Sequence, residues 1–208
     1  MKNNSLELVK LGDYIDVLTD YHSGGSYKLL KEKTKILYEP NYAVMVRTLN
    51  FENNDFKTDL IYCDKDSYDF LEYSHVIEND ILMNKIANAG SVYKMPKVNY
   101  LATCGMNLFL IRLKDIDQVY MYYVMKVNEK YIKGQSHGTT TTTITKDEVR
   151  NLSFLVFKDK EKQKRIVDIL SNLEKQIERN NAMIQKLLSF VYTICCISHK
   201  KGELQYAC

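Results

Sequence analysis

Three aspartates form the group of side chains whose type and spacing come nearest to a catalytic metal site. Asp64, Asp66 and Asp69 lie within six residues of one another. A metal-dependent nuclease needs clustered carboxylates beside a lysine to hold its cation and activate water. An acidic loop between two strands is, however, more often simply solvated. We therefore expect neither a metal site nor nuclease activity here.

The histidines and cysteines offer no other catalytic pattern. The four histidines, residues 22, 75, 137 and 199, are scattered without the spacing of zinc ligands, and no nucleophile is paired with a base. An odd number of cysteines without a C-x-x-C spacing predicts neither a disulfide framework nor a zinc knuckle. These are Cys63, Cys104, Cys195, Cys196 and Cys208.

Glycine and proline usage argues against a nucleotide or cofactor site. Gly24, Gly25 and Gly90 mark turns, but none of them lies in a G-x-x-x-x-G-K-[ST] or G-x-G-x-x-G context. An adenine methyltransferase would also need an Asp/Asn-Pro-Pro-aromatic motif, and the chain contains only Pro40 and Pro96. The sequence therefore predicts no cofactor, and it predicts a chain that recognises a partner without catalysing a reaction.

Length and hydropathy predict a cytoplasmic chain. Its 208 residues, 45% of them hydrophobic, suffice for one core domain of about 150 residues and an extension. Residues 1–11 lack the continuous apolar core of a signal peptide. The apolar run at residues 187–197 is too short to span a bilayer.

A basic segment at residues 85–133 is where we expect contacts with nucleic-acid phosphates. The whole chain has a formal charge of only +3, but this segment has eight basic residues against three acidic ones, a net of +5. Lysines in such a segment can neutralise phosphates, although a cationic surface is as often merely solvated. The candidates for phosphate contact are Lys85, Lys94, Lys97 and Lys133.

Sequence-specific recognition of DNA would also need polar side chains that reach base edges. Five candidates lie near the ends of predicted strands: Arg47, Asn88, Gln135, Ser136 and His137. The threonine run at residues 139–143 leaves two interpretations open. Its hydroxyl groups could donate to a DNA backbone, or the run could be a solvent-facing strand.

Short strands must position these residues, because the first half of the chain is rich in Tyr, Val, Ile and Thr. Residues 106–113, MNLFLIRL, form the strongest predicted strand. An apolar run of this length without breakers is typical of a strand buried on both faces, so we place it centrally in the sheet. The other predicted strands are residues 42–48, 60–63, 91–93 and 152–157.

Two shorter helices are also predicted. Residues 117–131 suit a helix, and Thr145 with Glu148 forms a capping-box pattern for a short helix that begins at Lys146. The inward face of the first helix is assigned to Val119, Tyr122, Tyr123 and Val127.

The most regular pattern in the chain is a long helix at residues 159–188. It contains no Gly or Pro, and its apolar residues recur at spacings of four and three, interrupted by Asn180. At about 1.5 Å per residue it would be a rod of roughly 45 Å, too long to line one small domain. We therefore expect a partner helix. The predicted pairing residues are Ile166, Leu170, Leu173, Ile177, Ile184 and Leu187.

The predicted fold class is thus α+β. One recognition-type domain with a mixed sheet covers residues 1–157, a coiled-coil helix covers residues 158–190, and a tail without an assigned role covers residues 191–208.

The start of the long helix carries a Gln-x-x-Ile motif, Gln163 to Ile166, followed by Ile169-Leu170, Leu173 and Ile177. Upstream lie Leu11-Gly12-Asp13, Glu78-Asn79-Asp80-Ile81-Leu82 and Ser136-His137-Gly138-Thr139-Thr140. In their order and spacing these segments resemble the specificity subunits of Type I restriction-modification systems, in which a target recognition domain runs into a long spacer helix. The likeness extends to about Leu188.

Two features depart from that family. Its members usually have Pro just before the helix and Glu beside the Gln, where this chain has Leu155-Val156-Phe157 and Lys162. A full member carries two recognition domains and two spacer helices, and this chain has the length for one of each.

The resemblance implies a non-catalytic, sequence-specific subunit or half-subunit that binds double-stranded DNA. Such a subunit directs a methyltransferase subunit, and through it a translocating restriction subunit, to a target site in host defence. It also favours Thr139 and Thr140 as part of a binding loop, because the family places a loop of this composition at the end of its recognition domain. The alternative function is a coiled-coil scaffold or adaptor whose α+β head binds a protein.

The single helix implies a dimer. The resemblance predicts a two-fold homodimer with antiparallel helices, or pairing with a different half-subunit. A two-fold dimer requires a target that is an inverted repeat with a spacer between the half-sites.

Overall fold

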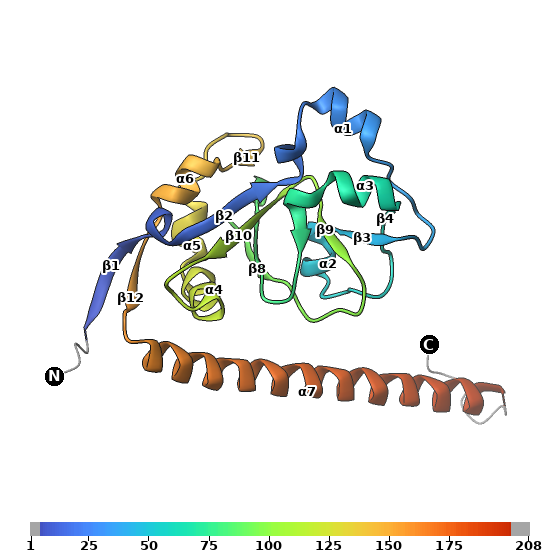
Figure 1. The fold of residues 1–208 in the computed structure, drawn as a ribbon. Helices are drawn as coiled ribbons and strands as arrows, with labels where there is room; N and C mark the ends of the chain where they lie inside the picture. The colour runs from blue at the N-terminus through green and yellow to red at the C-terminus, as the bar shows by residue number, and fades with distance from the viewer. Residues whose placement is uncertain (1–4, 201–208) are drawn as a thin grey trace. The chain divides into compact units, whose positions relative to one another are not determined.

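The computed structural model describes residues 5–200, with the side chains of residues 5–195 (Figure 1). The chain divides into two compact units, residues 1–164 and residues 165–208, and each is described by itself. The first unit contains two four-stranded sheets, two short ribbons and several short helices. The prediction of an α+β fold with a long C-terminal helix is confirmed.

The first four-stranded sheet is antiparallel, and the strongest predicted strand lies inside it. β10 (Leu108–Leu113) pairs with β2 (Ile15–Asp20) on one side and with β6 (Ile81–Asn84) on the other, and β6 pairs with β8 (Val92–Lys94). The first four residues of β10 are all buried. The central position is therefore confirmed, but the strand begins two residues later than predicted, and Met106 is 43% exposed.

The second four-stranded sheet is mixed. Its order is β4 (Tyr62–Cys63), β3 (Ala43–Val46), β9 (Ala102–Cys104) and β5 (His75–Val76), with β3 and β9 parallel. The predicted strand at residues 42–48 is shorter in the structure, because the chain turns into α2 (Thr48–Glu52). The side-chain oxygen of Asn50 accepts a hydrogen bond from the Arg47 N–H and fixes this turn.

The principal core cluster joins the two sheets. Val44 and Cys104 come from the second sheet, and Leu82, Leu108 and Leu110 come from the first; all five are at most 2% exposed. Burial of each such side chain stabilises the fold by roughly 1.5–3 kcal/mol. The buried side chains of this cluster therefore fix the two sheets relative to each other.

Short helices and two ribbons complete the first unit. α6 was predicted, and its capping box is confirmed: Glu148 N–H donates to Thr145 Oγ1, and Thr145 N–H donates back to the Glu148 carboxylate. The other short helices have seven residues or fewer, too few for a periodic pattern to reveal them. The bounds of α6 are Lys146–Asn151. Those of the other short helices are η1 (Leu11–Tyr14), η2 (Tyr21–Gly24), α1 (Tyr27–Lys33), α3 (Lys65–Phe70) and η3 (Glu72–Ser74). The antiparallel ribbons are β1 (Leu6–Lys10) with β12 (Ser153–Phe157) and β7 (Ile86–Ala87) with β11 (Thr142–Thr143).

The helix predicted at residues 117–131 is two helices, α4 (Gln118–Val127) and α5 (Glu129–Lys133). Asn128 ends α4, because its backbone N–H and its side-chain amide both donate to the carbonyl of Val124. The predicted inward face was wrong in part. Val127 is 85% exposed, and Val119 and Tyr122 are only half-buried. The buried residues of α4 are Tyr120, Met121, Tyr123 and Met125, which meet β8 and β12.

The second unit consists of α7 (Lys160–Lys200) from Arg165 onward. α7 has 41 residues, and at 1.5 Å per residue it is about 60 Å long. Residues 191–200, which the sequence analysis assigned to a tail, continue this helix. Cys208 and the Cys196 side chain lie outside the part that the structure describes. No helix among the described residues is long and apolar enough to cross a membrane.

Gln163 fastens the start of α7 to the first unit. Its side chain is 2% exposed, its Oε1 accepts from the Asp117 N–H at 3.0 Å, and its Nε2 donates to the Phe157 carbonyl at 2.6 Å. One amide thus ties the first turn of the helix to both β12 and the N-cap of α4. These bonds explain in physical terms why the Gln of the Gln-x-x-Ile motif is needed at this position.

We predict that replacing Gln163 with Ala lowers the free energy of unfolding by about 1–3 kcal/mol, because two backbone groups lose their partner and a small cavity opens. Urea unfolding measures the change. The control is Gln176→Ala, which alters the same residue type at an exposed position of the same helix. Equal midpoints for the two variants would contradict the role given to Gln163.

Candidate nucleic-acid interface

The loop at residues 134–145 contains β11 and is closed by a bridge between His137 and Thr143. His137 and Thr143 exchange both backbone hydrogen bonds, at 2.9 and 2.8 Å, and so join the two ends of the exposed segment between them. Gly138 has a φ of +107°, and a Cβ at this position would lie 2.3 Å from the Thr141 carbonyl oxygen. Glycine is therefore required for the tight turn at the tip of the loop.

The side chain of His137 is held from both ring nitrogens. Nδ1 lies 3.0 Å from Glu148 Oε1, and Nε2 lies 3.1 Å from Thr143 Oγ1. The other carboxylate oxygen of Glu148 accepts the Thr145 N–H. This hydrogen bond, with that from His137, holds the pKa of Glu148 below its ordinary value. The loop and the first turn of α6 therefore form one hydrogen-bonded structure in which His137 has a fixed orientation.

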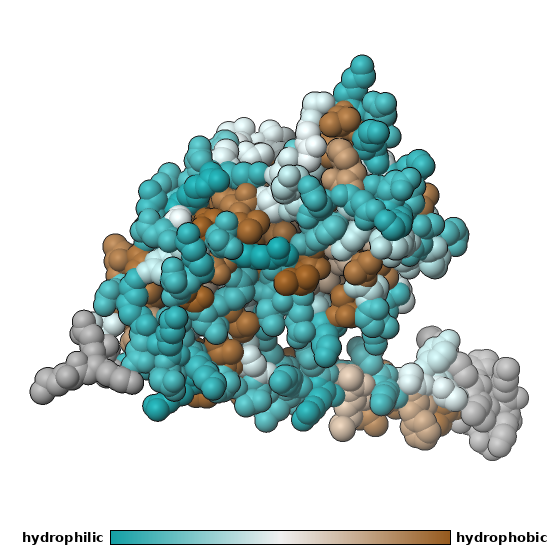
Figure 2. Space-filling view, in the orientation of Figure 1, coloured by the Kyte–Doolittle hydropathy of each residue, from teal (hydrophilic) through white to brown (hydrophobic). Residues whose placement is uncertain are grey.

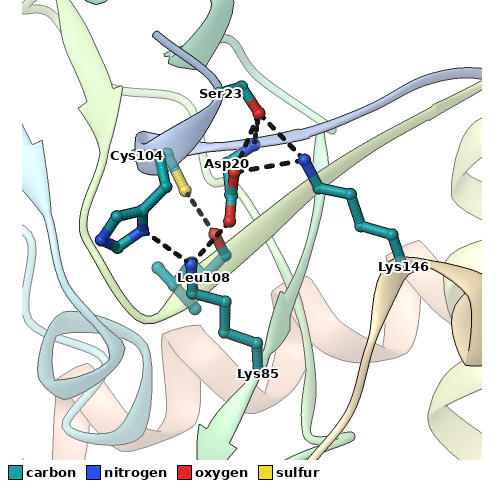
Figure 3. A network of polar contacts seen from close by, with 7 residues as sticks. Asp20, Ser23, Lys85, Cys104, Leu108 and Lys146 are labelled. Carbon is teal, nitrogen blue, oxygen red and sulfur yellow. Dashed lines mark hydrogen bonds and ion pairs between the residues drawn. The ribbon is translucent and has the colours of Figure 1, made fainter. Parts of the chain in front are cut away.

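A buried network of charges lies at the base of the ribbon (Figure 3). Lys85 Nζ donates to Asp20 Oδ2 at 2.6 Å and lies 3.0 Å from His22 Nδ1. Lys146 Nζ donates to Asp20 Oδ1 at 3.2 Å and to Ser23 Oγ at 2.9 Å. The side chains of Lys85 and Asp20 are only 10% and 9% exposed. One carboxylate at the end of β2 is thus shared by two ammonium groups from distant parts of the chain.

Lys85 also fixes the ribbon through its backbone. Its N–H donates to the Asn107 carbonyl at 2.9 Å, and its own carbonyl accepts the Ile144 N–H at 3.1 Å. Since Lys85 directly precedes β7 and Ile144 directly follows β11, this residue ties down both strands of the ribbon. The side-chain network and the ribbon are therefore parts of one structural unit.

The network sets the protonation states of its members. Burial alone would raise the pKa of Asp20, but the hydrogen bond and charge of Lys85, with smaller contributions from Ser23 and Lys146, lower it below its ordinary value. Burial and the charge of Lys85 lower the pKa of His22. Both shifts favour an ionised Asp20 carboxylate and a neutral His22 imidazole at neutral pH.

The structure corrects the prediction that Lys85 contacts phosphate. The residue is 8% exposed, and its ammonium group is held by Asp20, so it is a buried structural cation. Two other predicted phosphate contacts have neighbours of their own: Lys94 Nζ lies over the rings of Tyr122 and Tyr123, and Lys133 pairs with Glu129 at 3.8 Å. Lys97 is exposed.

The ribbon brings together most of the predicted base-reading residues. Asn88, next to β7, and Gln135, His137, Thr139 and Thr140 of the 134–145 loop are all exposed. Ser136 is half-buried and donates to the Lys133 carbonyl. Arg47 lies outside this group, at the start of α2, where it pairs with Asp59 at 3.2 Å. Of the threonine run, only Thr142 and Thr143 form a strand, so residues 139–141 present their hydroxyl groups from a loop.

Sequence reasoning missed the two residues that complete the network, Asp20 and Lys146. A lysine enclosed in an apolar stretch, ILMNKIANAG around Lys85, was the available signal, because a buried lysine needs a carboxylate partner. The partner itself is 65 residues away in the sequence and leaves no local trace.

The acidic candidates have structural roles. Asp64 caps α3 by accepting the Ser67 N–H, and Asp69 pairs with Lys65. Within the described residues no group of three or more His, Cys, Asp or Glu could hold a metal ion. Cys63 and Cys104 are buried free thiols, and burial raises the pKa of Cys63 to about 11.

Comparisons with known proteins agree on one family. A model of the Type I restriction modification DNA specificity domain matches residues 5–189. The specificity subunit of the Type I restriction enzyme MjaVIII from Methanocaldococcus jannaschii is 29% identical over 133 residues, which cover 60% of this chain and 31% of the relative.

Solved structures show a similar fold. The S subunit of a Type I restriction-modification system from M. genitalium has a TM-score of 0.53 and 16% identity, over 86% of this chain and 42% of that one. The HsdS subunit from Thermoanaerobacter tengcongensis has a TM-score of 0.56 and 18% identity, over 97% and 46%. A chain from a study of the assembly of the type I R-M system has a TM-score of 0.59 and 20% identity, over 97% and 47%. The chain thus spans less than half the length of these relatives.

We predict that Lys85→Met lowers the free energy of unfolding by about 3 kcal/mol, because the Asp20 carboxylate loses its closest cation inside the fold. Urea unfolding measures this loss, and Lys130→Met, at an exposed position of the same basic segment, is the control. Asp20→Asn combined with Lys85→Met should cost less than the sum of the two single changes, because no unpaired charge is then left. Strict additivity would contradict a direct Asp20–Lys85 interaction.

Proposed function

The chain belongs to the Type I restriction modification DNA specificity domain family, and from this premise we propose that it reads a DNA sequence on behalf of a restriction-modification complex. Specificity subunits are the non-catalytic DNA-recognition components of such systems. The observation that carries the proposal is the extent of the family match. Residues 5–189 include the first unit from residue 5 onward and most of α7, so the match covers both a domain and its helix.

Base reading is proposed for the exposed polar residues of the β7–β11 ribbon and the 134–145 loop. Asn88 and Gln135 carry donors and acceptors of the kind that pair with base edges, and Thr139 and Thr140 suit backbone contacts. His137, whose two ring nitrogens are held by Glu148 and Thr143, positions the loop for these contacts. The ribbon is narrow enough to enter a major groove. Because Lys85 and Gly138 fix its geometry, these side chains are presented from a rigid support, which lowers the entropic cost of binding.

Partners follow from the family. One of the solved structures with this fold comes from a study of complex assembly in the type I R-M system. We propose that a DNA methyltransferase subunit binds this chain directly, and that a restriction subunit joins through the complex. We propose a cytoplasmic location for this complex. We propose no cofactor bound to this chain.

We propose that α7 pairs with another helix, because its predicted pairing residues form an exposed apolar stripe, called the seam below. Leu173, Ile177, Ile184 and Leu187 are 49–58% exposed. The helix extends past residue 188, and the four-three spacing continues through Val191 and Ile194, which are 55% and 47% exposed. An apolar stripe of this length is stabilised by burial against another helix.

An antiparallel second copy matches the residues beside the seam. In one antiparallel register Ile177 packs opposite Asn180 of the second copy, and every seam residue then has a partner. In this register Ile169 of each copy lies near Phe190 of the other, at both ends of the helix pair. Both residues are more than 60% exposed in the single chain. A parallel pair would instead place Ile169 beside Glu174. The antiparallel homodimer is therefore the arrangement that we propose, with Ile166, Leu170 and Leu173 in its interface.

Salt dependence tests the main proposal against an adaptor function. We predict that affinity for duplexes that carry the target falls steeply between 50 and 200 mM salt, with a log–log slope of about −0.9 for each neutralised phosphate. The target is found by mapping methylated sites in cells that contain the methyltransferase partner, and a two-fold homodimer predicts an interrupted inverted repeat. A chain without duplex affinity at low salt would support the adaptor. An asymmetric or uninterrupted motif would reject the homodimer.

We predict that Leu173→Asp converts the dimer into a monomer, because a charge in an apolar helix contact costs several kcal/mol, and each 1.4 kcal/mol weakens the association tenfold. Sedimentation velocity measures the change. The control is Asn172→Asp, which adds the same charge at the neighbouring exposed position, outside the seam. If Leu173→Asp sediments like the unchanged chain, the seam is wrongly assigned.

A further inference from the structure

The basic residues with no internal partner lie mainly outside the segment that the sequence analysis selected. In that segment Lys85 pairs with Asp20, Arg112 with Asp80 and Lys126 with Glu129. By contrast, Lys28, Lys31 and Lys33 of α1 are exposed, and no hydrogen bond or ion pair within the described residues holds their ammonium groups. α1 thus carries three free cations and one carboxylate, Glu32, on seven residues, a net charge of +2.

α1 and the loop that follows it, residues 26–42, form an arm whose backbone is fastened to the domain at several points, among them a bridge between Leu37 and Tyr62. Ser26 caps α1 by accepting the Leu29 N–H, and Leu30, 1% exposed, inserts into a core cluster with Met45. Ser67 Oγ accepts the Lys35 N–H and donates to the Lys33 carbonyl. The backbone of the arm is therefore fixed. Lys35 pairs with Asp64 at 3.2 Å, while the side chains of Lys28, Lys31 and Lys33 project into solvent. Figure 2 shows hydrophilic side chains projecting where α1 lies.

Exposed tyrosines accompany these lysines. Tyr27 and Tyr38 are 73% and 79% exposed, so two large rings face water and bury little surface in the folded chain. A tyrosine hydroxyl donates to phosphate oxygens, and its ring can pack on a sugar. Lysines interspersed with exposed tyrosines fit a polyanion with alternating charged and apolar surface better than they fit an acidic protein segment.

The arm lies close to the proposed base-reading ribbon. η2 leads into α1, and Ser23 of η2 accepts a hydrogen bond from Lys146, the first residue of α6. Lys146 in turn follows the 134–145 loop directly. Figure 1 shows α1 and the loop at β11 on the same side of the first unit, and Figure 3 shows the Ser23–Lys146 contact that joins them. One bound duplex can therefore meet both.

We propose that the arm at residues 26–42 binds the phosphate backbone of the same duplex whose bases the ribbon reads. This inference rests on the proposed function. The lysines act as point charges on flexible stems, so they add affinity and position the duplex without selecting bases. Base choice stays with the ribbon, and the arm supplies the electrostatic part of binding that the paired lysines of residues 85–133 do not supply.

The test uses the full 208-residue chain with Lys28, Lys31 and Lys33 all replaced by Gln. Affinity for target and non-target duplexes is measured by fluorescence anisotropy at several salt concentrations. We expect affinity at 0.1 M salt to fall roughly 10- to 100-fold for both duplexes, and the log–log salt slope to become less negative by about 2 to 3. The ratio of target to non-target affinity should stay constant.

The matched control removes the same charge elsewhere. Lys160, Lys175 and Lys186 of α7 are exposed, and their joint replacement by Gln also lowers the net charge by three. If both triple variants lower DNA affinity equally, the effect comes from net charge and not from the arm, and the proposal is overturned. Unchanged binding by the arm variant would overturn it as well, and would point to an acidic protein as the partner of the arm. If the unaltered chain binds no duplex, the proposed function fails first and the arm proposal fails with it.

Discussion

The buried ion pair between Asp20 and Lys85 is the interaction on which the geometry of the proposed recognition surface depends. It joins the end of β2 to the residue that precedes β7, and through Lys146 and Ser23 it also joins α6 to η2. Each of these segments alone is too short to be stable. Because a buried charge without a partner is costly, the segments can adopt only arrangements in which both ammonium groups reach the same carboxylate. The pair thus defines the geometry of a surface that consists mostly of loops.

The rest of the domain follows from apolar burial, and this is the part that the sequence predicted well. The run at residues 106–113 became β10 at the centre of a sheet, and the capping box at Thr145 and Glu148 became α6, because both patterns are local. The long helix was predicted for the same reason. Its extension to Lys200 was missed, since the apolar residues at 187–197 lie on several faces and hide the seam.

The candidate site was less predictable, for reasons that individual lysines illustrate. Counting charges selected Lys85 and Lys133, yet a count cannot tell a solvated lysine from one that neutralises a neighbour. Lys85 meets a carboxylate 65 residues away, and Lys133 meets Glu129 one helical turn away. Conversely, Lys28, Lys31 and Lys33 lie in a stretch with acidic neighbours and drew no attention. Only the fold shows which cations remain available to a partner.

The β7–β11 ribbon is paired with neither four-stranded sheet, and the 134–145 loop beside it depends on the turn at Gly138. Substitutions at the exposed loop positions therefore leave the core clusters untouched. A lineage of such proteins can exchange these residues, and even change the length of the loop, without a loss of folding that selection would remove. The residues proposed to contact DNA are thus separated from the residues that support the fold, so that the proposed specificity can change at little cost in stability.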